Sequence, residues 1–176
     1  MPLPWKLATV CLLRRCDKTL FIDYTSHQHP IHEGFYAPPG GKVEEHEDFM
    51  QTTQREVREE TNIMTKSLVY RGVVRFHNEE RTLKGRTFRH NFRVHIYDCH
   101  DFNDSFAKAN EGGRLVWVDD SEILNIPISA GDNVLWKWLG KYQTVDGAIV
   151  HRGEHVVEYR VDGMFLDGRR ETIHYP

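Results

Sequence analysis

The sequence predicts an α+β fold with a mixed β-sheet. Short segments rich in β-branched and aromatic residues recur along the chain, and two segments of helical composition lie between them. The 176 residues suffice for one domain with a substantial core. We therefore expect a single domain over residues 1–176, with its core at about 5–162 and a loose tail or an added strand at 163–176.

The expected elements alternate along the chain. Strands are expected at residues 6–14, 19–24, 67–76, 87–97, 115–118, 148–150 and 156–161. Helices are expected at residues 47–61 and 132–139, with a helical turn at 119–124. Asp17 and Lys18 form the first turn, and residues 151–153 turn the last hairpin. The run Pro-Pro-Gly-Gly at 38–41 cannot be helical, and one of its glycines is expected to adopt a positive φ.

Composition and charge exclude several classes of partner. The net charge of −3 gives no broad positive field, so we expect neither stable nucleic-acid binding nor membrane association. The apolar run at residues 7–13 is too short to span a bilayer, and we expect no secretory segment. Cys11, Cys16 and Cys99 lack metal-ligand spacing, which predicts reduced thiols in a cytoplasmic protein.

Three glutamates in the first expected helix carry the main chemical signal. Glu56, Glu59 and Glu60 stand at i, i+3 and i+4, so a helix places their carboxylates on one face. Three like charges at this spacing repel one another, and a bound cation offsets that repulsion. Hard oxygen ligands favour Mg²⁺, with Mn²⁺ as the alternative. By themselves, the glutamates also fit a solvated surface helix.

Residues around these glutamates extend the pattern. Arg55 follows Glu47 by eight residues, about two helical turns, so the two can form an ion pair that orients the carboxylate face. Gly40 and Gly41 let the backbone approach a ligand closely, and Lys42 adds a cation at that point. The segment therefore favours a metal and phosphate site over a plain charged surface.

The segment from Gly41 to Ile63, GKVEEHEDFMQTTQREVREETNI, resembles the Nudix box, Gly-x5-Glu-x7-Arg-Glu-U-x-Glu-Glu-x-Gly-U, where U is a bulky aliphatic residue. The matching residues are Gly41, Glu47, Arg55, Glu56, Val57, Glu59, Glu60 and Ile63. They fill eight of the nine defined positions. The ninth, usually glycine, is Asn62, and asparagine also tolerates the left-handed conformation that ends a helix.

The resemblance implies a Nudix α/β/α sandwich, in which this loop–helix–loop lies against a mixed sheet, and a hydrolase of phosphorus-containing acid anhydrides. It implies metal ligands at Gly40, through its carbonyl, and at Glu56, Glu59, Glu60 and Glu111. The implied catalytic set is Arg55, Glu56, Glu59 and Glu111, with water attacking phosphorus. Gly41 and Glu47 have structural roles in the motif. A turn residue is the alternative for Glu111.

Beyond the box, residues 5–162 resemble the MutT-type branch, on His32-Glu33-Gly34-Phe35-Tyr36, on Glu111 before Trp117 and on Ile126-Pro127 before Gly131-Asp132. This branch includes oxidised-purine nucleoside triphosphatases, so the resemblance implies conversion of a nucleoside triphosphate such as 8-oxo-dGTP to monophosphate and pyrophosphate. Nucleotide sugars, ADP-ribose, dinucleoside polyphosphates and RNA 5′ ends are alternatives within the same chemistry. A non-catalytic nucleotide sensor is an alternative of another class.

Candidate substrate-binding residues are Lys42, Phe35, Tyr36 and Asp132. Ala37 stands where mammalian members carry a base-reading asparagine, and Ser129 where several relatives have a stacking tryptophan, so the nucleobase stays open. His27, His29 and His32 are candidates for a loop lining the cleft or for metal ligands. Arg81, Lys84 and Arg86 form a solvated loop or touch phosphates. The expected partner is a small nucleotide, and the expected state a monomer or homodimer.

Overall fold

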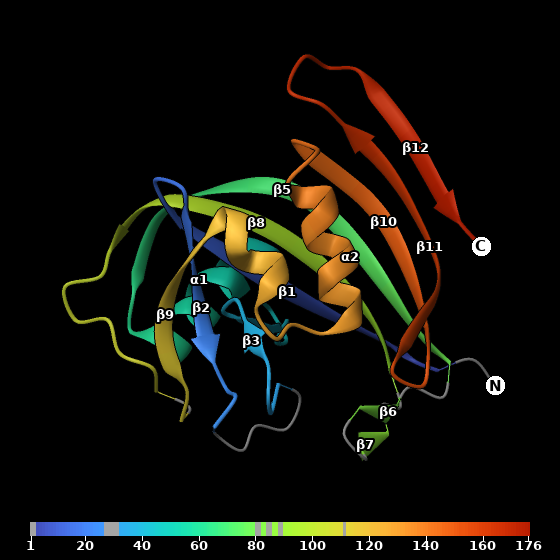
Figure 1. Cartoon of the computed structure of the whole chain (residues 1–176). Helices are drawn as coiled ribbons and strands as arrows, with labels where there is room; N and C mark the ends of the chain where they lie inside the picture. Colours follow the sequence, from blue (N-terminus) through green and yellow to red (C-terminus); the bar gives the residue numbers. More distant parts are fainter. Residues whose placement is uncertain (1–2, 27–31, 80–81, 84–85, 88–89, 111) are drawn as a thin grey trace. The chain divides into compact units, whose positions relative to one another are not determined.

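A mixed β-sheet accompanied by helices forms the architecture of the computed structural model (Figure 1), which confirms the predicted fold class. The structure describes residues 3–26, 32–79, 82–83, 86–87, 90–110 and 112–176. Its elements are β1 (Trp5–Arg15), β2 (Lys18–Asp23), β3 (Tyr36–Ala37), β4 (Gly40–Lys42), α1 (Phe49–Thr61), β5 (Met64–Glu79), β6 (Thr82–Leu83), β7 (Arg86–Thr87), β8 (Asn91–Asn103), β9 (Arg114–Asp119), the 3-10 helix η1 (Asp120–Asn125), α2 (Ala130–Leu139), β10 (Thr144–Arg152), β11 (His155–Met164) and β12 (Arg170–Tyr175).

The chain forms two compact units. The first comprises Met1–Ala8, Arg71–His95 and Ala130–Pro176, and the second comprises Thr9–Tyr70 and Ile96–Ser129. The long strands β1, β5 and β8 contribute residues to both. The expectation of one domain stays a prediction.

The first unit contains the parallel pairing that makes the sheet mixed. Strand β10 pairs in parallel with β5, from Val145 opposite Gly72 to Arg152 opposite Glu79. It also pairs antiparallel with β11, which in turn pairs antiparallel with β12. Of the two alternatives for residues 163–176, the added strand is therefore the one observed. Helix α2 packs on β10 and β11, and its Trp138 lies where a Cβ on Gly147 would be only 2.5 Å away.

The second unit carries the Nudix-like segment. Strand β2 pairs antiparallel with β1, β3 and β9, and β4 pairs with β1. Val57 of α1 and Ile63, the aliphatic positions of the box, are buried in one core cluster together with Cys11, Leu13, Leu20 and Cys99. This burial fixes which face of α1 turns inward. Glu60 is buried as well, whereas Arg58 and Glu59 are exposed. All three cysteines are free, as predicted.

Two local predictions in this segment are wrong. Helix α1 begins at Phe49 rather than Glu47, because Asp48 is the N-cap: its side chain accepts from the backbone N of Gln51, and the Gln51 side chain accepts from the backbone N of Asp48. Gly40 lies in strand β4, and neither it nor Gly41 has a positive φ. The prediction that Asn62 ends the helix is confirmed, since its φ of 56° and ψ of 19° are left-handed.

The last hairpin turns later in the chain than expected. Strand β10 extends to Arg152, so the last hairpin turns at Gly153, with a φ of 62°, and Glu154. Of the predicted basic loop, Arg81 and Lys84 lie outside the described residues, as does the side chain of Arg86. Within the described ranges, no helix is both long and apolar enough to cross a membrane.

Candidate active site

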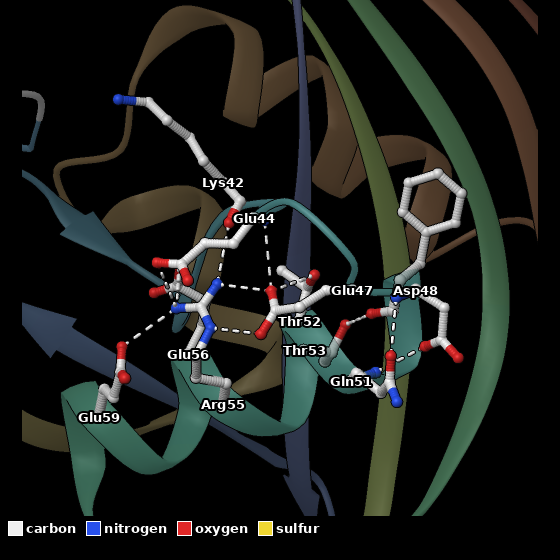
Figure 2. Close-up of polar contacts among 11 residues, drawn as sticks. Lys42, Glu44, Glu47, Asp48, Gln51, Thr52, Thr53, Arg55, Glu56 and Glu59 are labelled. Atoms are coloured by element: carbon white, nitrogen blue, oxygen red, sulfur yellow. Dashed lines mark hydrogen bonds and ion pairs between the residues drawn. The ribbon is translucent and has the colours of Figure 1, made fainter.

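Arg55 is the centre of a hydrogen-bonded cluster on α1 (Figure 2). Its Nε and Nη2 bind the two carboxylate oxygens of Glu47 at 2.7 and 2.9 Å. Its Nη1 donates to Glu56 at 2.9 Å and to Glu59 at 3.1 Å, and Nη2 also donates to the Lys42 carbonyl at 3.0 Å. The predicted ion pair between Glu47 and Arg55 is present. Its geometry differs from the prediction, because Glu47 lies in the turn before the helix rather than on a helical face.

Arg55 and the carboxylates around it stabilise one another in their charged forms. The hydrogen bonds from Arg55, helped by those from Thr52 and from the backbone N of Glu44, hold the pKa of Glu47 at about 2, below its ordinary 4.5. The same carboxylates, Glu47 first, then Glu56 and Glu59, raise the pKa of Arg55. The Arg55 guanidinium therefore stays charged, and the Glu47 carboxylate stays ionised, over the ordinary pH range.

The glycine pair brings strand β4 close to its neighbours on two sides. A Cβ on Gly41 would stand 2.3 Å from Oε1 of Glu56, so the missing side chain leaves room for that carboxylate. A Cβ on Gly40 would stand 2.2 Å from the carbonyl oxygen of Thr9 in β1. The two glycines are required for close approach, one to a carboxylate and the other to a backbone.

Glu60 links the end of α1 to the same strand. Although buried, its carboxylate accepts a hydrogen bond of 2.8 Å from the backbone N of Gly40. The glycine strand therefore lies directly against Glu56 and Glu60, whereas Glu59 is linked to Glu56 through Arg55.

A loop near residue 110 closes the carboxyl end of α1. The carbonyls of the last turn lack partners inside a helix. Here the Glu59 carbonyl accepts from the Asn110 side chain, the Glu60 carbonyl from the Asn110 backbone, and the Thr61 carbonyl from the Lys108 backbone, at 2.7 to 2.9 Å. The Arg58 carbonyl accepts from the backbone N of Asn62. The segment that leads to Glu111 is therefore fastened to the helix end.

The family model described as NUDIX domain matches residues 4–139. This chain belongs to the Nudix family. The uncharacterized Nudix hydrolase YvcI of Bacillus subtilis (strain 168) is 28% identical over 156 residues, which cover 88% of this chain and 92% of that protein.

Solved structures named MutT share the fold of this Nudix chain. The Mutator MutT protein from Bacillus halodurans superposes with a TM-score of 0.71 at 22% identity, covering 89% of this chain and 97% of the other. The MutT protein from Methanosarcina mazei Go1 gives a TM-score of 0.62 at 22% identity over 78% and 94% of the two chains. The family match confirms the predicted Nudix membership and, together with the similarity to the Bacillus subtilis Nudix hydrolase, the predicted enzyme class, a hydrolase of phosphorus-containing acid anhydrides. The MutT structures show that the predicted resemblance to MutT proteins extends to the fold.

Nudix hydrolases use divalent cations, and the chemistry of this site fits one. Glu56 and Glu59 both accept hydrogen bonds from the same nitrogen, Nη1 of Arg55, so the two carboxylates already face one positive charge. The donors are hard oxygens. Across the described part of the chain, no three acidic, histidine or cysteine side chains converge closely enough to form a metal centre by themselves. In this structure the carboxylates are bonded to Arg55 and to the Gly40 amide.

The other predicted residues lie in different settings. Lys42 is exposed at the end of β4, and Figure 2 shows its side chain extending away from the carboxylates. Phe35 and Tyr36 are half-buried in the second unit, where the Tyr36 backbone N donates to the Pro127 carbonyl at 2.7 Å. Asp132 belongs to the first unit, in the first turn of α2. Glu111 lies outside the described residues.

The remaining positions bear less directly on the site. Ala37 and Ser129, the two positions at which the sequence left the nucleobase open, are both buried. His27 and His29 lie outside the described residues, and the His32 ring stacks on Tyr24 at 5.9 Å between centroids.

A polar group that sequence reasoning missed holds Tyr36 in place. Asp23 is buried at the end of β2, where it accepts from the backbone N and Oγ1 of Thr25 at 2.9 and 2.6 Å and from Arg114 at 2.9 Å. Burial alone would raise the pKa of Asp23, but these bonds and one from the Tyr36 hydroxyl outweigh it and lower the pKa below 3.8. A charged residue within the apolar strand 19–24 was the available signal.

Proposed function

We propose that this Nudix protein is a Mg²⁺-dependent pyrophosphohydrolase that cleaves a nucleoside triphosphate, with 8-oxo-dGTP as the first candidate, to the monophosphate and pyrophosphate. Mn²⁺ is the alternative cation. One observation carries the proposal: Nη1 of Arg55 donates to both Glu56 and Glu59, and Glu56 lies next to Gly41 of strand β4. The MutT names of several structural relatives favour a nucleotide substrate.

The proposed metal ligands are the carboxylates of Glu56, Glu59, Glu60 and Glu111, with the carbonyl of Gly40. When bound, the cation would hold the phosphates, neutralise developing charge and make the attacking water more acidic. Support for Glu111 comes from its neighbour Asn110, which is bonded to the carbonyls of Glu59 and Glu60. In the sequence, Glu111 directly follows Asn110.

In this proposal the chain's own groups divide the work. Arg55 holds Glu56 and Glu59 in fixed orientations, so that one of these carboxylates can accept the proton of the attacking water. Lys42, which is exposed, is proposed to contact the phosphates. Tyr36 and Phe35 are proposed to stack on the base, with Tyr36 held by Asp23. Asp132 is proposed to accept a hydrogen bond from a purine edge.

The test of the metal site is Glu59→Gln. Glutamine keeps an oxygen that can accept from Arg55, but it loses the charge that a cation needs. Turnover should fall by roughly a hundredfold or more, while the unfolding temperature stays near that of the native chain because the side chain is 57% exposed. Glu45→Gln is the matched control, since Glu45 is exposed in the same segment and lies outside the cluster. Full activity in Glu59→Gln would refute the site.

The substrate is tested by a screen. Nucleoside triphosphates, with and without an oxidised purine, should be assayed with Mg²⁺ or Mn²⁺ for released pyrophosphate, beside nucleotide sugars, ADP-ribose, dinucleoside polyphosphates and 5′-triphosphate RNA. The proposal predicts the highest kcat/KM for 8-oxo-dGTP and no activity in the presence of a chelator. Slow and similar rates on every triphosphate would contradict the assignment to oxidised purines. A higher kcat/KM for one of the other substrate classes than for any nucleoside triphosphate would assign the enzyme to that class.

A further inference from the structure

One of the three buried threonines of α1 directs its hydroxyl out of the helix. Thr52, Thr53 and Thr61 all have 0% exposure. Thr53 and Thr61 donate to the carbonyls four residues earlier, those of Phe49 and Val57. Such a bond within the helix is the common choice for a buried threonine. Thr52 instead donates to Oε2 of Glu47 at 2.9 Å, as Figure 2 shows.

The Thr52 bond is one of four hydrogen bonds that the Glu47 carboxylate accepts. Oε1 accepts from Nε of Arg55, and Oε2 accepts from Nη2 of Arg55, from Thr52 and, at 3.3 Å, from the backbone N of Glu44. A carboxylate offers about four acceptor sites. Glu47 lies before the first residue of α1, so its position is not set by the backbone hydrogen bonds of the helix. The Thr52 hydroxyl therefore ties this carboxylate to the rigid body of α1.

The position of Glu47 determines the direction of Arg55. A guanidinium is planar, and its five N–H donors have a fixed geometry. When one edge binds both oxygens of Glu47, the remaining nitrogen, Nη1, has one direction left, toward Glu56 and Glu59. A rotation of the Glu47 carboxylate would therefore turn Nη1 away from the two glutamates.

We propose that Thr52 is a positioning residue of the Nudix site: its hydroxyl fixes Glu47, and through Glu47 and Arg55 it fixes the carboxylates of Glu56 and Glu59. Thr52 touches neither metal nor substrate in this scheme, and it acts through two intervening side chains. The inference rests on the proposed metal site at those glutamates. Nothing in the Nudix pattern of this sequence marks position 52, because the box leaves it undefined.

The experiment compares three substitutions in the same helix. Thr52→Val removes the hydroxyl at nearly constant volume, and Thr52→Ser keeps it. Thr53→Val removes an equally buried hydroxyl that bonds only within the helix. Each variant is measured for kcat, KM, unfolding temperature and the affinity for Mn²⁺ alone by calorimetric titration.

For Thr52→Val we expect kcat and the Mn²⁺ affinity each to fall about tenfold, as when the outer support of a metal ligand is lost, with KM within about twofold. Thr52→Ser should stay within about twofold of the native kcat and affinity. Thr53→Val should lose a similar amount of stability but keep both values, because its hydroxyl does not reach Glu47. This pattern separates positioning from the general effect of burying a valine.

The exchange of the Arg55 Nε proton with water gives a readout independent of turnover. It should accelerate about tenfold in Thr52→Val and stay unchanged in Thr53→Val. Equal loss of kcat in Thr52→Val and Thr53→Val, or native Mn²⁺ affinity and proton exchange in Thr52→Val, would overturn the role of Thr52. Full activity in Glu59→Gln would instead overturn the proposed function, and the proton exchange at Arg55 would still decide whether Thr52 positions that side chain.

Discussion

Replacing Gly41 by alanine tests whether the place of the Glu56 carboxylate matters for catalysis. The new Cβ would stand 2.3 Å from Oε1, 2.4 Å from Cδ and 2.6 Å from Oε2 of Glu56, whereas ordinary contact begins at 3.4 Å. The carboxylate must therefore move by about 1 Å, away from its bond to Arg55. A displacement of about 1 Å at a reacting group can lower turnover about 100-fold. We expect such a loss in kcat.

The fold should tolerate the same substitution. The atoms in conflict belong to the far end of a flexible side chain, and the φ of Gly41 is not positive, so alanine fits the backbone. Circular dichroism should therefore show an unfolding temperature within about 2 °C of the native one, a shift of under about 1 kcal/mol. Activity is assayed as pyrophosphate release at saturating nucleotide and metal.

Gly40→Ala is the matched control. Its Cβ would meet the backbone of β1, at 2.2 Å from the Thr9 carbonyl oxygen and 2.8 Å from the Val10 Cα, and neither atom can move aside alone. Overpacking of this kind costs about 1–3 kcal/mol. The unfolding temperature should fall by about 4–10 °C. Native kcat in Gly41→Ala, or an equal loss of stability in both variants, would refute the reasoning.

Two further predictions concern stability. Hydrogen bonds from Arg55 hold the pKa of Glu47 at about 2 against an ordinary 4.5, so this pair stabilises the fold fully above pH 4.5 and is lost as the pH falls toward 2. Thermal unfolding between about pH 2 and pH 6 should show a steeper acid loss for the native chain than for Glu47→Gln, and equal slopes would contradict this. Asn62→Ala should lower the free energy of unfolding in urea by about 1–2 kcal/mol, because alanine disfavours the left-handed conformation. Asn62→Gly should lose less, and an equal loss would point to the Asn62–Phe106 hydrogen bond instead.

Local patterns in the sequence predicted much of the catalytic segment. The spacing of Glu56, Glu59 and Glu60 predicted one helical face, and Asn62 was expected to end the helix, as it does. Both inferences depend on backbone geometry within a few residues, which the local sequence determines. The start of the helix was missed by two residues, because a favourable composition at Glu47 and Asp48 did not reveal that Asp48 caps the helix.

The roles of Gly40 and Gly41 show where local reasoning ends. One glycine of the run was expected to adopt a positive φ, yet both lie in strand β4 and neither has a positive φ. What they provide is space, against Thr9 for one and Glu56 for the other. These partners are distant in sequence, so only the pairing of β4 with β1 and the packing of α1 reveal them.

By itself, the sequence determined the family, the enzyme class and the face of α1 that carries the glutamates, because these follow from residue identity at fixed spacing. The tertiary structure alone decided that Glu47 binds Arg55 from the turn before the helix, that Thr52 supports this contact, and that Asn110 closes the helix end. Such contacts depend on how turns and loops fold back on α1. Hydrogen bonds of this kind are set by position in space, which residue spacing along the chain does not encode.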